Sequence, residues 1–301
     1  MTAKMTPEWI AVDWGTSNLR VWAMGPRAPL AEAQSDAGMG RLSRDDFEPA
    51  LLALIGPWLG EAAMPVMACG MVGSRQGWFE APYRAVPCRP LDPGAAVPVA
   101  ARDPRIALRI VPGLKQTGPA DVMRGEETQI AGALALGAAD GVICLPGTHS
   151  KWCHVSAGEV VSFQTAMTGE VFALLSEHSV LRHGMAGDGF DDAAFDGAVA
   201  EALSRPEAFA ARLFSLRAEA LIGSLAAPVA RARLSGLLIG LELAATRPYW
   251  LGRVVTLVGA TAISGLYVRA LAAQGLTARR LPATDCTLAG LTLAMTCEDI
   301  P

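Results

Sequence analysis

Two short turns in the sequence carry residue types that bind phosphate. Residues 13–17 read Asp-Trp-Gly-Thr-Ser, and residues 147–150 read Gly-Thr-His-Ser. A tight turn after a buried strand presents consecutive backbone N–H groups and hydroxyls, and such a concave set of donors binds phosphate oxygens. Asp13 adds a carboxylate that suits Mg²⁺, directly or through water. A single turn of this kind is most simply an ordinary hairpin, but the pair, with Asp13 leading the first, favours a polyphosphate site.

A third segment, residues 253–274, has the pattern of a strand, a glycine and a helix. Gly259 and Ala260 at the junction would let a flat ligand approach the backbone, although an ordinary β–α turn has the same pattern. The sequence contains no GxxxxGK[ST] motif, so a P-loop kinase is not supported. No GxGxxG motif follows the first predicted strand, which counts against a dinucleotide-binding domain of that type.

Phosphoryl transfer also needs a group that takes the proton of the attacking hydroxyl. Residues 121–129 (DVMRGEETQ) concentrate three acidic side chains at the start of a predicted helix. Glu126 and Glu127 would leave the helix in different directions, so at most one faces a given site. Acids at a helix N-terminus also serve the helix dipole alone. We predict Glu126 as the catalytic base because Gly125 frees the backbone before it, with Asp121 second and Glu127 third.

The stretch 70–78 (GMVGSRQGW) offers polar groups on a glycine-rich backbone. Its hydroxyl, amide, guanidinium and aromatic groups suit a polyhydroxylated anion, and a solvated surface loop is the simpler alternative. We expect a carboxylate on such an anion to be bound by Arg75 or Arg124, because a guanidinium can donate two parallel N–H groups to it. The candidate substrate-binding residues are Ser74, Arg75, Gln76, Trp78 and Arg124.

The elements that must position these residues form two α/β patterns in succession. The two Gly-Thr turns lie about half a chain length apart, which suggests duplicated domains. We predict an α/β fold with an N-terminal domain at 1–138 and a C-terminal domain at 139–301. The predicted strands are 8–13, 18–24, 65–69, 141–145, 151–155 and 253–258; helices are predicted at 45–59, 125–137 and 260–275 and over most of 168–246, and loops with short strands at 85–113.

Composition excludes several other classes of protein. With 51% hydrophobic and 18% charged residues, disorder is not expected, and a net charge of −4 provides no basic field for nucleic acid. The longest apolar stretch, 130–145, is too short for a membrane span and contains Asp140. The N-terminus lacks the features of a signal peptide, and the six cysteines have no CxxC spacing, so reduced thiols are expected. We predict a cytoplasmic protein with no membrane or nucleic-acid partner; the oligomeric state is open, with a homodimer among the alternatives.

Six segments, in order over residues 10–270, resemble the 2-dehydro-3-deoxygalactonokinase family, also called 2-oxo-3-deoxygalactonate kinases. GMVGSRQGW, MRGEETQ and LPGTHSKW are together specific to this family, whereas DWGTS marks only the sugar kinase/Hsp70/actin superfamily. The matching segments are IAVDWGTSNLRVW, ACGMVGSRQGWFEAPY, DVMRGEETQIAGAL, CLPGTHSKW, FQTAMTGEVFALL and VGATAISGLYVRAL.

The resemblance implies two ribonuclease-H-like domains of the actin/hexokinase type with ATP in a cleft between them. It implies ATP- and Mg²⁺-dependent phosphorylation of 2-dehydro-3-deoxy-D-galactonate at its 6-hydroxyl, in D-galactonate catabolism. Leu145 stands where the wider superfamily often has an acidic residue, so a water-activating role at the second turn is not expected. Carried onto this chain, the family's nucleotide site implies cofactor-binding roles for Gly15, Thr16, Ser17, Gly147, Thr148, His149, Gly259, Ala260 and Ser264, with Asp13 as the metal ligand.

Two other functions fit parts of the same pattern. An exopolyphosphatase-type phosphatase shares the fold and has a similar glycine-glutamate-glutamate stretch. An actin-like, nucleotide-dependent regulator would be no enzyme at all. The polar stretch 70–78 favours a kinase over a regulator, because a regulator needs no acceptor site. The sequence does not fix how strictly a galactonate-derived keto-acid is preferred over a gluconate-derived one.

Overall fold

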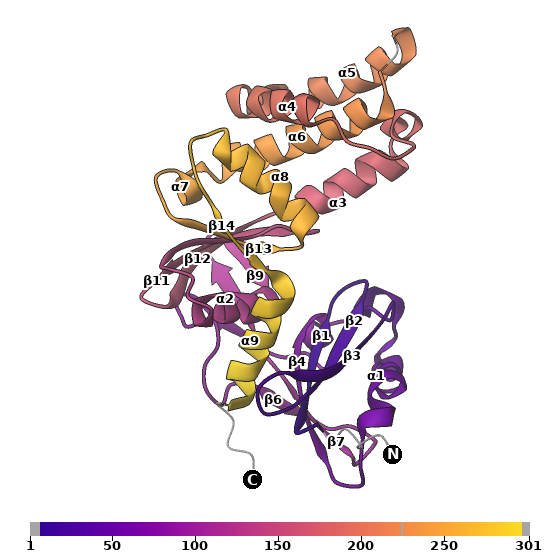
Figure 1. Ribbon diagram of the computed structural model, residues 1–301, viewed down its shortest axis with the longest axis vertical. Coiled ribbons are helices and arrows are strands. Elements are labelled where there is room, and N and C mark those ends of the chain that lie inside the picture. Colours follow the sequence, from indigo (N-terminus) through magenta and orange to yellow (C-terminus); the bar gives the residue numbers. More distant parts are fainter. Residues whose placement is uncertain (1–6, 224, 297–301) are drawn as a thin grey trace. The chain divides into compact units, whose positions relative to one another are not determined.

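The computed structural model describes residues 7–223 and 225–296, which form two compact units (Figure 1). Of the described residues, the first unit contains 7–138, 156–162 and 283–296, and the second contains 139–155, 163–223 and 225–282. The C-terminal helix therefore packs with the N-terminal part of the chain. The predicted division into domains 1–138 and 139–301 stays a prediction.

A six-stranded sheet forms the centre of the first unit, in the order β3-β2-β1-β4-β7-β6. β1 pairs antiparallel with β2 and parallel with β4, and β4 pairs parallel with β7. The predicted strand–turn–strand at the N-terminus is thereby confirmed. The strands are β1 (Trp9–Trp14), β2 (Leu19–Met24), β3 (Pro29–Ser35), β4 (Met64–Gly70), β6 (Val97–Val99) and β7 (Ile106–Ile110).

Alternate residues of β1 pack on opposite faces of this sheet, as the two-residue period of a strand requires. Ile10 belongs to a buried cluster with α1 (Phe47–Ile55), and Ala11 belongs to a second cluster with α9 (Ala283–Thr296). The predicted helix 45–59 is shorter than expected, because Gly56 and Pro57 end the α-helix in a 3₁₀ turn. Helix α9 was not predicted.

Helix α2 (Glu126–Ala135) and helix α9 approach each other through glycines. A Cβ on Gly132 of α2 would lie 1.8 Å from the carbonyl oxygen of Cys286, and one on Gly290 would lie 2.0 Å from that of Thr128. Any side chain at these two positions would force the helices apart. A three-stranded sheet leads into α2, in the order β5 (Tyr83–Ala85), β8 (Gly113–Thr117) and β9 (Ala120–Met123).

A five-stranded sheet, β12-β11-β10-β13-β14, repeats the strand order of the first sheet. It belongs to the second unit except for residues 156–162, at the end of β11 and the start of β12, which are grouped with the first. β10 pairs antiparallel with β11 and parallel with β13, as β1 does with β2 and β4. The repeated order, with the second strand turned back beside the first, is the α/β arrangement that was predicted. The strands are β10 (Gly141–Leu145), β11 (Ser150–Ser156), β12 (Glu159–Ala166), β13 (Val255–Gly259) and β14 (Arg279–Pro282).

Helices make up most of the second unit between residues 168 and 250, as predicted. Gly236 and Gly240 of α6 allow close contact with α4. A Cβ on Gly236 would lie 2.5 Å from a carbonyl oxygen of α4, and one on Gly240 would lie 2.7 Å from another. In the described ranges 7–223 and 225–296, no helix has the length and apolar character of a membrane span. The helices are α3 (Thr168–Ala173), α4 (Asp192–Ser204), α5 (Phe209–Ile222), α6 (Ala227–Ala245), α7 (Arg247–Trp250) and α8 (Thr261–Ala272).

Short helical turns complete both units. A π-helical turn, Leu174–His178, continues α3. The 3₁₀ turns are Met39–Arg41, Arg44–Asp46, Gly56–Trp58, Met71–Gly73, Val180–Gly184 and Pro206–Ala208.

Candidate active site

Asp13 lies near the end of β1, with its side chain 16% exposed. Its carboxylate forms an ion pair with Arg20, which stands directly opposite on β2. On the other side, the thiol of Cys69 on β4 lies 3.9 Å from the second carboxylate oxygen. The carboxylate is therefore oriented by groups from both neighbouring strands. Arg20 was not among the predicted site residues, although its place opposite Asp13 follows from the register of the hairpin.

The turn after β1 is fixed by the segment 38–40. Gly15 donates to the carbonyl of Asn18 at 2.9 Å, and Gly40 donates to the carbonyl of Thr16 at 2.9 Å. A Cβ on Gly38 would lie 2.2 Å from the backbone of Ser17, so only glycine allows this contact. The side chains of Thr16 and Ser17 are exposed. The turn thus holds its backbone in place while two hydroxyls face solvent.

Three backbone segments of the first unit meet beside Asp13. Gly70 ends β4 with φ +89°, and a Cβ there would lie 2.5 Å from the carbonyl oxygen of Trp14. Gly125 precedes α2 with φ +105°, and a Cβ there would lie 3.2 Å from Cα of Gly70. Positive φ and close approach both require glycine at these positions. The start of α2, with its two glutamates, is thereby brought to the ends of β1 and β4.

The two glutamates at this helix start have different surroundings. Glu126 is partly exposed, and its carboxylate accepts the backbone N–H of Arg124 at 2.9 Å. Glu127 is fully buried, and both its oxygens lie 2.8 Å from the backbone nitrogen of Gly125. Burial, together with the charge of Glu126, raises the pKa of Glu127 to about 7, although the N–H of Gly125 opposes the shift. The prediction that the two side chains differ in direction agrees with these contacts.

Asp13 and Glu127 both act on the thiol of Cys69. Burial raises the pKa of the Cys69 thiol well above its usual value, and the carboxylates of Asp13 and Glu127 raise it further. Asp121, the other acid of the stretch 121–129, is not on α2; it lies on β9, opposite Gln116 of β8. Its carboxylate accepts the backbone N–H of Val122 at 2.8 Å.

The two candidate arginines for the sugar-acid carboxylate differ sharply in environment. The side chain of Arg75 is 80% exposed, and its nearest acid is Glu80 at 3.4 Å. Arg124 is 8% exposed; its Nη2 donates to the carbonyl of Ala81 at 2.7 Å, and its guanidinium lies 4.2 Å from the ring centroid of Tyr83. In the described part of the chain, Nε and Nη1 of Arg124 have no hydrogen-bond partner.

Ser74 shares this property with Arg124. It is 5% exposed, and its hydroxyl also lacks a partner among the described residues. A Cβ on the adjacent Gly73 would lie 2.8 Å from Nη1 of Arg124, so the polar stretch 70–78 packs directly on the guanidinium. Of the other predicted residues, Gln76 is exposed, and Trp78 is half-buried, with its ring edge-on to Trp14 at 6.5 Å.

The second turn is held by the start of α3. The backbone of Glu170 donates to the carbonyl of Thr148 at 3.0 Å, and its carboxylate contacts Nε2 of His149 at 2.5 Å. A Cβ on Gly169 would lie 2.4 Å from the carbonyl oxygen of Gly147. Gly147, Thr148 and His149 are all exposed. As in the first unit, a fixed turn presents its side chains outward.

The strand–glycine–helix segment lies beside this second turn. A Cβ on Gly259 would lie 2.6 Å from the hydroxyl of Ser264 and 3.6 Å from the ring of Pro146, which directly precedes the turn. Ser264 is 2% exposed, and its hydroxyl has no partner in the described residues. Ala260 is exposed at the start of α8. The predicted phosphate and adenosine segments of the second unit are therefore adjacent.

The donor set suits a magnesium ion that arrives with phosphate. Residues 7–223 and 225–296 contain no cluster of three His, Cys, Asp or Glu side chains that could hold a metal. Mg²⁺ usually takes one or two protein carboxylates and completes its shell with phosphate oxygens and water. Asp13 meets that need, because its carboxylate is partly exposed and is oriented by Arg20.

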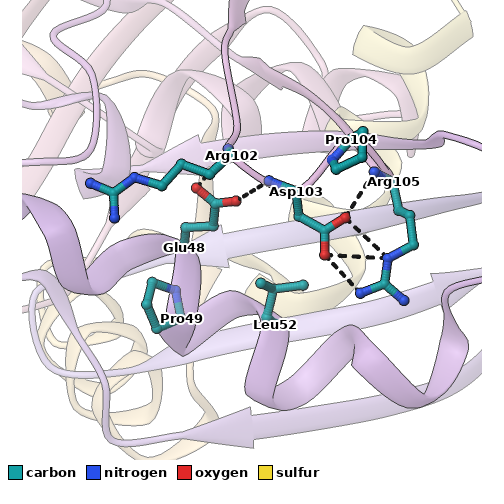
Figure 2. A pocket seen from close by; sticks show the side chains of 7 residues that line it. All are labelled: Glu48, Pro49, Leu52, Arg102, Asp103, Pro104 and Arg105. Carbon is teal, nitrogen blue, oxygen red and sulfur yellow. Dashed lines mark hydrogen bonds and ion pairs between the residues drawn. The ribbon is translucent and has the colours of Figure 1, made fainter.

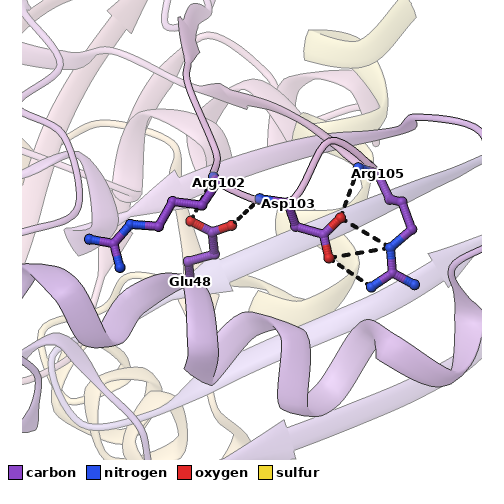
Figure 3. Close-up of polar contacts among 4 residues, drawn as sticks. All are labelled: Glu48, Arg102, Asp103 and Arg105. Atoms are coloured by element: carbon purple, nitrogen blue, oxygen red, sulfur yellow. Dashed lines mark hydrogen bonds and ion pairs between the residues drawn. The ribbon is translucent and has the colours of Figure 1, made fainter.

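A hollow of about 500 Å³ lies between α1 and residues 102–105, away from the predicted site (Figure 2). Both of its carboxylates already have hydrogen-bond partners. Glu48 accepts the backbone N–H groups of Arg102 and Asp103 at 2.9 Å and 2.6 Å (Figure 3). Asp103 is bound by the guanidinium of Arg105 at 2.7 Å, which holds the pKa of that carboxyl at about 2. This hollow contains none of the predicted site residues and is not the candidate site.

Comparison with known proteins decides the family. The family model for 2-keto-3-deoxy-galactonokinase matches residues 13–294. The chain belongs to the 2-keto-3-deoxy-galactonokinase family. A candidate 2-dehydro-3-deoxygalactonokinase of Rhizobium meliloti (strain 1021) is 42% identical over 298 residues, which cover 95% of this chain and 96% of that protein. The 2-dehydro-3-deoxygalactonokinase of Escherichia coli (strain K12) is 36% identical over 274 residues, which cover 90% of this chain and 91% of that protein.

A solved structure supports the same membership in the 2-keto-3-deoxy-galactonokinase family. The crystal structure of a candidate 2-dehydro-3-deoxygalactonokinase from Sinorhizobium meliloti matches with a TM-score of 0.86 at 41% identity, and covers 95% of this chain and 97% of that one. The family match begins at Asp13 and ends within α9, so it includes both turns and every other predicted site residue. The resemblance read from the sequence motifs is confirmed.

Proposed function

We propose that this chain transfers the γ-phosphoryl group of ATP to the 6-hydroxyl of 2-dehydro-3-deoxy-D-galactonate. Family membership supports a carbohydrate kinase. The observation that carries the proposal is the meeting of β1, β4 and α2 through Gly70 and Gly125, because it gathers Asp13 and Glu126 in one unit. The reaction would serve D-galactonate catabolism in the cytoplasm.

In the first unit, Asp13 binds Mg²⁺ and the turn Gly15–Ser17 donates to phosphate oxygens. Mg²⁺, when bound with ATP, neutralises charge on the transferred phosphoryl group. Arg20 keeps the Asp13 carboxylate in one orientation. Glu126 accepts the proton of the attacking hydroxyl, and its bond to the N–H of Arg124 fixes its position at the helix start. In the second unit, the turn 147–149 binds phosphate and the segment 259–264 binds the adenosine.

Arg124, not Arg75, binds the carboxylate of the sugar acid. A buried guanidinium with unpaired donors is costly unless an anion or water completes its hydrogen bonds. Arg124 has two such nitrogens, and the hydroxyl of Ser74 is a third buried donor in the same region. Gly73 leaves room beside Nη1 of Arg124 that a larger residue would fill, because a Cβ there would lie 2.8 Å from that nitrogen. Arg75 is exposed and already forms an ion pair with Glu80, so its guanidinium needs no anionic ligand to offset burial.

An ADP-release assay tests the proposed reaction. The purified protein is given ATP, Mg²⁺ and one acceptor from a panel of 2-keto-3-deoxy sugar acids, the parent aldonic acids and neutral hexoses. We expect ADP release with 2-dehydro-3-deoxy-D-galactonate and at least about a hundredfold lower kcat/KM with glucose, because glucose leaves Arg124 unpaired. Equal rates for glucose and the keto-acid would refute the carboxylate site. ADP release that needs no acceptor would favour a phosphatase.

A further inference from the structure

A buried carboxylate lies at the centre of the second unit, on a helix to which sequence motifs assign no function. Glu242, on α6, is 3% exposed. It accepts Nε1–H of Trp152 at 2.7 Å and the hydroxyl of Tyr267 at 2.7 Å. The hydroxyl of Thr168 donates to it as well. Both carboxylate oxygens therefore have partners, because Trp152 donates to Oε1 and both Tyr267 and Thr168 donate to Oε2.

These donors come from three elements: Trp152 from β11, Thr168 from α3 and Tyr267 from α8. Ser150 begins β11 immediately after residues 147–149, and its hydroxyl lies 3.5 Å from the backbone nitrogen of Gly147 and 2.9 Å from the hydroxyl of Tyr267. Thr168 begins α3, next to the Gly169 that abuts Gly147. The turn is therefore connected to Glu242 in two ways. One connection runs through the hydroxyls of Ser150 and Tyr267, and the other runs through α3, where Thr168 donates to Glu242 and Gly169 packs on Gly147.

The same carboxylate reaches the helix of the proposed adenosine segment. Tyr267 lies on α8, one turn after Ser264, and both side chains are buried. A single hydrogen-bonded chain thus runs from the turn through Ser150 and Tyr267 to Glu242. Because buried hydrogen-bond networks fix the relative positions of their members, a change in this network will move the turn relative to α8.

We infer that Glu242 is a positioning residue for nucleotide binding: through Ser150, Tyr267 and Thr168 it sets the turn 147–149 in register with the start of α8. It touches neither ATP nor the acceptor. The inference rests on the proposed function for its consequence, which is ATP affinity. Its structural content, the order of the turn, does not depend on that function.

Two variants each remove one hydroxyl of this hydrogen-bonded chain and leave the rest of the side-chain packing largely in place. Tyr267→Phe keeps the ring and deletes the hydroxyl between Ser150 and Glu242; Ser150→Ala deletes the next link toward Gly147. Thr246→Val is the matched control. Its buried hydroxyl bonds at 2.8 Å to the backbone carbonyl of Glu242 on the same helix, so the control loses a comparable bond that does not lead to the turn.

Two measurements decide the inference. Titration calorimetry with Mg·ATP should give a Kd raised about tenfold in Tyr267→Phe and Ser150→Ala, within twofold of wild type in Thr246→Val, with the KM for the keto-acid unchanged in all three. Hydrogen exchange of the nucleotide-free protein should be at least about fivefold faster at amides 147–150 in the first two variants only. Unchanged exchange at the turn in Tyr267→Phe, or equal acceleration in Thr246→Val, would overturn the inference. If the wild type itself does not bind Mg·ATP, the proposed function is refuted. The exchange data would still decide the role of Glu242.

Discussion

The carboxylate of Asp13 and the guanidinium of Arg20 face each other across the β1–β2 hairpin and form an ion pair. Both side chains are partly covered, so the pair holds the carboxylate at the end of β1 in a defined direction. Beside it, Gly70 and Gly125 bring the start of α2 to the same place. The positions of the candidate catalytic groups in the first unit therefore depend on three segments: the β1–β2 hairpin, the end of β4 at Gly70 and the start of α2 at Gly125.

Replacement of Asp13 tests the proposed metal ligand. Asp13→Asn should lower kcat at least about a hundredfold, because a neutral amide is a poor ligand for Mg²⁺ and metal-assisted charge stabilisation is worth several kcal/mol. The thermal midpoint should stay near that of wild type. Asp36→Asn, which removes an exposed carboxylate paired with Arg41, is the control and should keep full activity. Wild-type turnover in Asp13→Asn would exclude this role.

The proposed base is tested by comparing two acids, Glu126 and Asp121. Glu126→Gln should lower kcat by about 10²–10⁴-fold, the usual contribution of a general base, with ATP affinity preserved. Asp121→Asn should have a small effect, because Asp121 lies on the β8–β9 hairpin. If Asp121→Asn is the damaging change and Glu126→Gln is nearly silent, the two roles are reversed.

The buried Glu127 should make the stability of the protein depend on pH. Its carboxyl has a pKa of 4.5 when unfolded and about 7 when folded. Between pH 4.5 and 7 the folded state therefore holds a proton that the unfolded state loses, and this group's contribution to stability falls as the pH rises through that window. The loss amounts to at most about 3.5 kcal/mol, taking about 1.4 kcal/mol for each pKa unit.

Urea unfolding of Glu127→Gln at pH 4.5 and pH 8 measures this effect. The free energy of unfolding of the variant, relative to wild type, should increase between the two values. Glu61→Gln, which changes an exposed carboxylate, should show no such trend. A constant difference between Glu127→Gln and wild type across the range would contradict the raised pKa.

The two arginines are distinguished by steady-state kinetics. Arg124→Gln should raise the KM for the keto-acid by about ten- to a hundredfold, because it removes a charge-assisted bidentate contact. Arg75→Gln should change it less than threefold, since that side chain is mostly exposed. The KM for ATP should be unchanged in both. A larger effect of Arg75→Gln would assign the carboxylate to the surface arginine instead.

Much of the fold could be predicted where the sequence pattern is strong. The strand-like runs 8–13 and 18–24 on either side of a Gly-Thr-Ser turn identified β1 and β2. The two Gly-Thr turns suggested the duplication that the two sheets show. Helix α9 was missed, because its sequence of small and apolar residues has no clear period. Its partner in the first unit is set by contacts between Gly132 and Gly290 and the facing backbones, and such contacts between distant segments leave little trace in a local pattern.

The candidate site was predictable as a set of residues but not as an arrangement. Motifs pointed to Arg75 and Arg124 alike, because burial, which separates them, depends on how residues 73–81 fold over the second arginine. Arg20 could have been found from the hairpin register. Glu242 had one signal, a lone charge within the apolar run 237–245, but its donors come from three distant segments that only the tertiary structure brings together.

The position of the new phosphoester tests the central claim most directly. The protein is incubated with Mg·ATP and 2-dehydro-3-deoxy-D-galactonate, and the product is examined by two-dimensional ¹H–³¹P correlation spectroscopy. We predict one phosphorus signal coupled to the two protons on carbon 6, in an amount equal to the ADP formed. Phosphorus coupled to a different carbon, or inorganic phosphate as the sole product, would contradict the assignment of the chain as a 6-hydroxyl kinase.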